Sequence, residues 1–131
     1  MSGDQGFRIT RRIEFADTDA SGRAHFAAVL RHVEAAEHEC LRRAGVPAGD
    51  VEGAWPRVRV ECEYLRPLSF GEEITVVLRL SPVGVSSLVW TFSVESAGTD
   101  AARGSLTTVL VDDEGRPRQV PREWRTRLAG E

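Results

Sequence analysis

Two aspartates stand two residues apart in segment 17–22, whose sequence is DTDASG. An EF-hand calcium loop begins with this pattern but requires a bidentate glutamate at its twelfth position, where the chain has Ala28. A phosphatase with an Asp-x-Asp nucleophile needs a lysine and a longer chain, and this chain has no lysine. The third interpretation is a carboxylate beside the N-terminus of a helix, where backbone N–H groups polarise an electrophile. The alternative is that Asp17 or Asp19 only caps the turn or the helix.

The segments on either side must position this turn, and they carry two different hydrophobic periods. Apolar residues recur every three or four positions over residues 25–44, and Gly45 and Pro47 follow, which predicts one long helix. Elsewhere apolar residues alternate with polar ones, which predicts strands. The predicted strands are residues 7–15, 57–64, 74–80, 88–94 and 106–111; a turn is expected at 97–100 and a last helical turn at 121–128.

This β-α-β-β-β-β order predicts a single α+β domain over residues 1–131. One helix cannot cover both faces of a five-stranded antiparallel sheet. We therefore expect the sheet to wrap around the helix and to leave its second face or an edge for another subunit. The sequence thus predicts a homo-oligomer, either a dimer or a tetramer.

Composition narrows the class of protein. The net charge of −3 argues against a dedicated nucleic-acid-binding protein. All 17 basic residues are arginines, which excludes P-loop NTPases, lysine Schiff-base enzymes and haloacid-dehalogenase phosphatases. Cys40 and Cys62 lack metal-binding spacing, which favours a reducing compartment. The first six residues lack the basic and apolar regions of a secretory signal, and no apolar run reaches membrane-spanning length, so we expect a cytoplasmic protein without a membrane partner.

Three segments resemble the 4-hydroxybenzoyl-CoA thioesterase-like hotdog family. The first is residues 13–22 (IEFADTDASG), followed by His25-Phe26 and by Glu34-Ala35-Ala36. The second is residues 64–73 (YLRPLSFGEE), and a weaker third is residues 85–88 (VSSL). The resemblance covers nearly the whole chain and implies a hotdog fold, with five antiparallel strands wrapped around one long helix. It also implies hydrolysis of an acyl-CoA or acyl-carrier-protein thioester, with no metal and no redox cofactor.

The same resemblance implies roles for individual residues. In that family the second aspartate of the turn is catalytic, and it corresponds to Asp19. The Asp19 carboxylate would either attack the thioester carbonyl or activate the water that does. The backbone N–H of Phe26 would polarise the carbonyl oxygen, and Glu34, which matches the helix glutamate of the family, would orient groups near the site. The residues expected to bind substrate or to shape its site are Asp17, Gly22, His25, Ala27, Arg59, Ser86 and Ser87.

Two departures from the family pattern bear on the substrate. Ala28 and Val29 stand where relatives often have an asparagine and an aromatic residue, which would leave room for a bulkier acyl group. Residues 84–86 are not basic, although relatives that bind free CoA often carry basic residues there. Either other arginines meet the nucleotide phosphates, or the substrate is carried on an acyl carrier protein. The candidate arginines are Arg57, Arg59, Arg66 and Arg103.

Glu37 lies inside the apolar stripe of the predicted helix. A half-buried glutamate is either paired with an arginine or has a raised pKa suited to catalysis. We expect an ion pair, with Arg11 as the partner.

Two other functions remain open on the same scaffold. One is a hydratase that uses His25 with Glu34 or Glu37, and the other is a non-catalytic acyl-thioester-binding protein.

Overall fold

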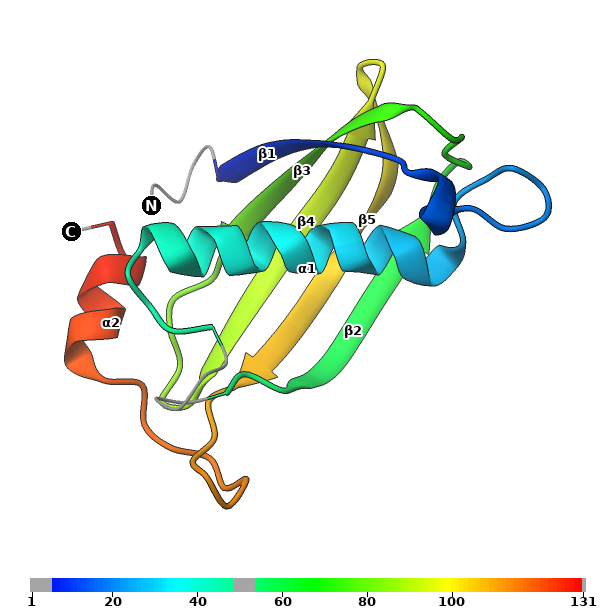
Figure 1. Ribbon diagram of the computed structural model, residues 1–131. Coiled ribbons are helices and arrows are strands. Elements are labelled where there is room, and N and C mark those ends of the chain that lie inside the picture. Colours follow the sequence, from blue (N-terminus) through cyan, green and yellow to red (C-terminus); the bar gives the residue numbers. More distant parts are fainter. Residues whose placement is uncertain (1–5, 49–53, 131) are drawn as a thin grey trace.

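The computed structural model describes residues 6–48 and 54–130, and its elements follow the predicted order (Figure 1). They are β1 (Phe7–Arg12), the short 3-10 helix η1 (Phe15–Asp17), α1 (Phe26–Arg43), β2 (Arg57–Tyr64), β3 (Glu73–Leu80), β4 (Ser87–Ser96), β5 (Thr99–Val109) and α2 (Arg122–Leu128). All strand pairs are antiparallel, and they form one sheet in the order β1-β3-β4-β5-β2. The long helix α1 lies across one face of this curved sheet, which confirms the predicted fold class (Figure 1).

Helix α1 forms where the three- and four-residue period predicts it. The ring of His25 caps its N-terminus by accepting the Ala27 N–H. At its other end Gly45 adopts a positive φ of 72°, so that the N–H of Val46 reaches back to the Leu41 carbonyl and closes the helix. The buried face of the helix consists of Ala28, Val29, His32, Val33, Ala36, Glu37, Cys40 and Leu41.

Strand β1 is shorter than the predicted strand 7–15. The alternation continues to Phe15, but the chain leaves the sheet before it, and Phe15 is 78% exposed. The cause is a pair of bonds between Glu14 and Asp17: the Asp17 carboxylate accepts the Glu14 N–H, and the Asp17 N–H donates to the Glu14 carbonyl. These two bonds close a 3-10 turn that is incompatible with extended backbone.

The β4–β5 hairpin is tighter than the predicted turn at 97–100. Ala97 and Gly98 both have positive φ, 52° and 82°, as in a two-residue type I′ turn. Strand β5 therefore begins at Thr99, seven residues before the predicted strand. The added residues include Ala101 and Ala102, which are buried.

Strand β2 forms an edge of the sheet that α1 leaves uncovered. The helix packs mainly on β3, β1 and β4. Along β2, Val58 is 61% exposed and Val60 is 42% exposed, although both belong to the predicted apolar face. Cys62 of the same set packs against the core, but the described part of one chain leaves Val58 and Val60 largely exposed.

The C-terminal helix α2 confirms the helical turn predicted at 121–128. Trp124 and Leu128 are buried, and Trp124 packs against Trp55 with ring centroids 6.3 Å apart. Arg127 donates to the carbonyl of Gly45, which joins α2 to the C-terminal end of α1. Among the described residues, neither α-helix has the length and apolar character needed to cross a membrane.

Candidate active site

The acidic turn, residues 17–22, is closed by backbone hydrogen bonds. The Asp19 N–H donates to the Arg23 carbonyl, and Thr18 pairs with Ala24 across the turn. The Gly22 N–H donates to the Asp19 carbonyl, and Gly22 has a positive φ of 79°, which glycine adopts without strain. The result is a compact turn that leads directly into α1.

Two segments that resemble the family lie side by side at this point. The Ala24 N–H donates to the Leu68 carbonyl at 2.7 Å, and Arg23 forms an isolated bridge with Ser69. The Phe70 N–H donates to the Gly22 carbonyl at 3.3 Å. The loop before β3 therefore holds the acidic turn against the sheet.

Asp19 is exposed and lines a surface cleft. Its Oδ1 accepts from the Ser21 hydroxyl at 2.5 Å and from the Ser21 N–H at 2.8 Å. These bonds, the hydroxyl first, lower the pKa of Asp19, which is therefore ionised at neutral pH. The cleft, of about 550 Å³, is lined by Phe15, Thr18, Asp19, Ala20, Gly22 and Phe70. Phe15 and Phe70 meet edge to face at its rim, with ring centroids 5.9 Å apart.

The N-terminus of α1 begins four residues after this turn. The His25 N–H donates to the Asp17 carbonyl at 2.8 Å, which fixes the chain as it enters the helix. The His25 ring accepts the Ala27 N–H, and the His25 carbonyl accepts the Ala28 N–H. For the N–H of Phe26, the hydrogen bonds of the described residues include no acceptor. An anionic oxygen at this end would also be favoured by the helix dipole.

A second, more apolar cleft of about 370 Å³ opens beside the same helix end. Its lining consists of Ala24, Phe26, Val29, Tyr64, Leu65, Arg66, Pro67, Leu68 and Ala101. The Tyr64 hydroxyl donates to the Phe26 carbonyl at 2.8 Å, which joins the end of β2 to α1. Burial and the neighbouring Cys62 raise the pKa of Tyr64 to about 12, so the phenol stays neutral.

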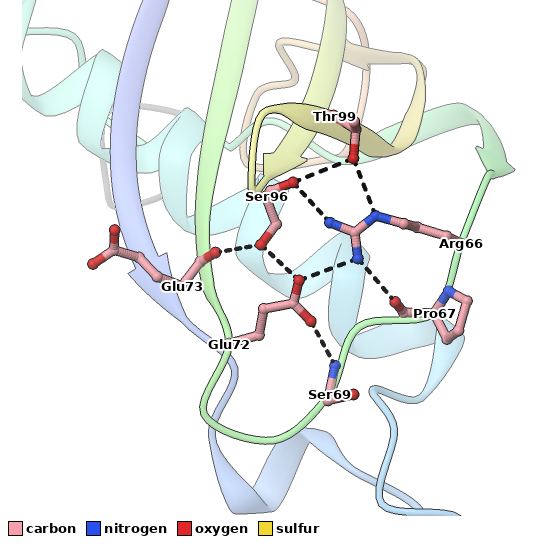
Figure 2. Close-up of polar contacts among 7 residues, drawn as sticks. All are labelled: Arg66, Pro67, Ser69, Glu72, Glu73, Ser96 and Thr99. Atoms are coloured by element: carbon pink, nitrogen blue, oxygen red, sulfur yellow. Dashed lines mark hydrogen bonds and ion pairs between the residues drawn. The ribbon is translucent and has the colours of Figure 1, made fainter.

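A polar network fixes the loop between the two clefts (Figure 2). Arg66 donates to Glu72 at 3.1 Å and to the Ser96 carbonyl at 2.8 Å. The Ser96 hydroxyl lies 2.6 Å from the same Glu72 oxygen, while the other oxygen accepts the Ser69 N–H at 3.0 Å. The bond from Ser96, followed by that from Ser69, lowers the pKa of Glu72. The network joins the end of β2, the start of β3 and the β4–β5 hairpin (Figure 2).

Asp17, the first aspartate of the turn, is buried and does not line either cleft. Its Oδ2 accepts the Glu14 N–H and lies 2.8 Å from Nε2 of His32. Burial opposes ionisation, but the Glu14 N–H, His32 and Arg31 outweigh it and lower the pKa of Asp17. Sequence reasoning missed His32, for which the only signal was a histidine inside the buried stripe of the helix.

The expected ion pair of Glu37 exists, but its predicted partner was wrong. Arg57 contacts both Glu37 and Glu34, whereas Arg11 donates to His32. A β-bulge between Arg57 and Arg59 breaks the alternation of β2, and Arg57 pairs with Thr108 in the register. Burial raises the pKa of Glu37 to about 7 despite the opposing Arg57 charge.

Several predicted site residues lie away from Asp19. Glu34 is held by Arg57 at 3.0 Å, and Arg59 pairs with Glu61 on the edge strand. Ser86 and Ser87 lie where β4 begins, opposite Val109. That is the other end of β5 from Ala101, which lines the apolar cleft. Asp19 and Gly22 line one cleft, whereas Phe26 lines the other. The short segment that ends at His25 and Ala27 connects them, and the Asp17 carbonyl accepts the His25 N–H there.

The candidate phosphate-binding arginines are engaged within the chain. Arg57, Arg59 and Arg103 pair with glutamates, and Arg66 belongs to the loop network. Within the described residues of one chain, His25 pairs with neither Glu34 nor Glu37, because its ring caps α1 and both glutamates contact Arg57. A hydratase would form this pair across a dimer, so that alternative stays a prediction.

A sequence model of the thioesterase-like superfamily matches residues 13–128, a range that includes the turn, both α-helices and four strands. The chain belongs to the thioesterase-like superfamily. This membership confirms the resemblance found in the sequence.

Relatives and solved structures of the superfamily agree with this assignment. The 1,4-dihydroxy-2-naphthoyl-CoA hydrolase of Synechococcus sp. (strain CC9311) is 29% identical over 131 residues, covering 89% of this chain and 84% of the relative. The enzyme of that name from Nostoc punctiforme is 29% identical over 117 residues, covering 86% and 79%. A hypothetical protein from Aquifex aeolicus superposes with a TM-score of 0.86 at 26% identity, covering 93% and 98%. A 1,4-dihydroxy-2-naphthoyl-CoA thioesterase from Synechocystis gives 0.83 at 20% identity, covering 93% and 94%, and this likeness confirms the hotdog fold.

Proposed function

We propose that this chain hydrolyses an acyl-CoA thioester and that Asp19 acts on the thioester carbonyl. Superfamily membership and the CoA thioester hydrolases among its relatives support the reaction class. The observation that carries the assignment to Asp19 is its ionised carboxylate in an open cleft, on the turn that enters α1. The Phe26 N–H, with no acceptor among the described residues, supports the polarisation of a carbonyl beside it.

The reaction consumes water and releases a carboxylic acid and a thiol. In one route the Asp19 carboxylate attacks the carbonyl carbon, the C–S bond breaks, and water hydrolyses the resulting anhydride. In the other route Asp19 removes a proton from the water that attacks the carbonyl carbon; the C–S bond then breaks, and the leaving thiolate takes up that proton. In both routes negative charge develops on the carbonyl oxygen, where the Phe26 N–H and the α1 dipole stabilise it.

The apolar cleft beside Phe26 is the proposed site of the acyl group. Its lining offers Ala24, Val29 and Leu68, which suit a hydrophobic acyl chain or ring rather than a charged one. Because Arg57, Arg59, Arg66 and Arg103 are already engaged, binding of the nucleotide phosphates would require exchange of an existing contact. An acyl carrier protein remains the alternative donor of the thioester.

We also propose that the active form is a homo-oligomer in which a second copy covers β2. The edge strand exposes Val58, Val60 and Tyr64, and Tyr64 also lines the apolar cleft. An uncovered edge with an apolar face is a template for pairing with another chain. A second copy seated there would close the open side of the cleft and exclude water from it.

The direct test measures release of free thiol from aromatic, short, medium and long acyl-CoAs, repeated with carrier-bound acyl groups. Asp19→Asn should lower kcat at least a hundredfold without changing the unfolding midpoint, because the exposed side chain acts in the chemical step. Asp113→Asn is the matched control, since Asp113 is an exposed aspartate in a distant turn. Wild-type turnover by the Asp19 variant would refute the assignment. Thioester binding without thiol release would instead indicate a non-catalytic binding protein.

A further inference from the structure

Arg11, His32 and Asp17 come from three separate elements and contact one another in a row, which is called the line below. Arg11 comes from β1, His32 from the second turn of α1, and Asp17 from η1. The Arg11 Nε lies 2.6 Å from Nδ1 of His32, and Nε2 of His32 lies 2.8 Å from Oδ2 of Asp17. His32 is 2% exposed and Asp17 is 6% exposed, so water does not compete for the contact between them, while the contact of Arg11 with His32 is half-buried.

The donors in this line fix the tautomer of His32. A guanidinium has only N–H donors, so Nδ1 of His32 must accept the Arg11 bond and carry no proton. The single ring proton then lies on Nε2 and is donated to Asp17. His32 is therefore a neutral imidazole that connects a cation to an anion. Besides His32, the Asp17 carboxylate contacts the backbone N–H of Glu14 and the guanidinium of Arg31, which lies 3.5 Å from Oδ1.

Asp17 joins this line to the candidate site. Its carbonyl accepts the His25 N–H at the entrance to α1, and its neighbour Thr18 begins the turn by pairing with Ala24. Holding the Asp17 side chain thus sets both where the turn starts and where the helix begins. Asp19 is carried by the turn, and the Phe26 N–H is the first of the helix.

We propose that His32 is a positioning residue: it links Arg11 to Asp17 and thereby holds Asp19 and the Phe26 N–H in the mutual geometry that the reaction needs. The inference rests on the proposed function of Asp19. Without His32, the buried Asp17 carboxylate loses a charge-assisted bond and moves toward solvent. The turn moves with it, and displacements of about 1 Å at a catalytic group can cost about a hundredfold in rate.

The activity test compares His32→Leu, His32→Gln and the control His38→Leu, which removes an exposed histidine from the same helix. The leucine variant should lose at least tenfold in kcat with a smaller change in KM. The glutamine variant should recover most of that loss, because its amide oxygen can accept from Arg11 while its amide N–H donates to Asp17. Equal impairment of both His32 variants, or wild-type kcat in a folded His32→Leu protein, would overturn the proposal.

A spectroscopic test separates this inference from the proposed function and uses the wild-type protein. Nitrogen chemical shifts of the His32 ring at pH 7.5 should report the neutral Nε2–H form. In His32→Leu the backbone amide signals of residues 18–26 should shift, whereas in His32→Gln they should stay near their wild-type positions. An Nδ1–H tautomer, or unmoved turn signals in the leucine variant, would overturn the positioning role even if the protein hydrolysed thioesters. Absence of thiol release by the wild type would refute the proposed function alone.

Discussion

Asp17 and Asp19 point to opposite environments although a single residue separates them. Asp17 is buried against His32, whereas Asp19 is exposed and bonded only to its neighbour Ser21 among the side chains of the described residues. The 3-10 turn η1 ends at Asp17, whereas Asp19 belongs to the following turn, where its N–H donates to the Arg23 carbonyl. The two aspartates therefore do not share one regular strand, in which residues two apart would face the same side. One carboxylate therefore fixes the turn while the other remains available to a ligand.

The bonds from Ser21 to Asp19 predict a change in the pH profile. Ser21→Ala removes the hydroxyl that contributes most to the lowered pKa of Asp19, so this pKa should rise toward its ordinary value. Because Asp19 acts as a carboxylate, the acid limb of kcat/KM should move to higher pH. The profile of Ser93→Ala, on the outer side of β4, should match that of the wild type. An unmoved acid limb in Ser21→Ala would show that Asp19 does not set it.

The sequence predicted the turn and the helix well because both depend on local residue types. Glycine at position 22 and the period of α1 are readable without knowing the fold. The line through His32 was not predictable in this way, because its partner Arg11 is 21 residues away and belongs to a strand. The contact of Arg57 with Glu37 was not predictable either, because the register shift between Arg57 and Arg59 interrupts the alternation of β2 and leaves no mark in the sequence.

The network around Glu72 was equally unpredictable from the sequence. Arg66 and Ser96 are 30 residues apart, and only the closure of the sheet brings them to the same carboxylate. The family resemblance marked residues 64–73 as a unit but gave no reason for their polar residues. The structure supplies that reason, because the loop holds the acidic turn through Leu68, Ser69 and Phe70.

Replacement of Glu72 should therefore disturb both stability and substrate binding. Glu72→Ala frees Arg66 and leaves the Ser69 N–H without its acceptor, which should cost about 1–3 kcal/mol of unfolding free energy. The loosened loop lines the acyl cleft, so KM should rise more than kcat falls. The control is Glu73→Ala, since Glu73 is exposed and meets Arg12 only at 3.5 Å. Equal effects of the two substitutions on KM would argue against a role of the network in the cleft.

Glu37 predicts a dependence of stability on pH. Its pKa rises from an ordinary 4.5 to about 7 in the folded chain, so the folded state holds a proton that the unfolded state releases. Stability from this group is complete below about pH 4.5 and is lost as the pH rises to about 7. At about 1.4 kcal/mol per pKa unit, the loss amounts to about 3 kcal/mol.

Urea unfolding of the wild type and of Glu37→Gln at several pH values isolates this contribution. The glutamine variant cannot titrate at this position, so its stability relative to the wild type should improve by about 3 kcal/mol between pH 4.5 and pH 8. The carboxylate of Glu39, in contrast, is ionised throughout this range, because bonds from Arg42 and Arg43 lower its pKa to about 2. Glu39→Gln should accordingly show no such trend. A constant difference between the wild type and Glu37→Gln would mean that Glu37 stays charged in the folded protein.

The exposed edge strand β2 predicts that an added charge would disrupt the oligomer. If a second copy covers this strand, a charge at Val60 would be buried without a partner in the assembly, which is strongly unfavourable. Val60→Lys should therefore shift the sedimentation of the protein from an oligomer to a monomer at micromolar concentration. It should also lower thioesterase activity, because the apolar cleft beside Tyr64 would stay open to water. Val85→Lys is the matched control, since Val85 is 71% exposed but lies before β4, outside the cleft. A wild-type protein that sediments as a monomer and is fully active would remove the reason for a second copy at this edge.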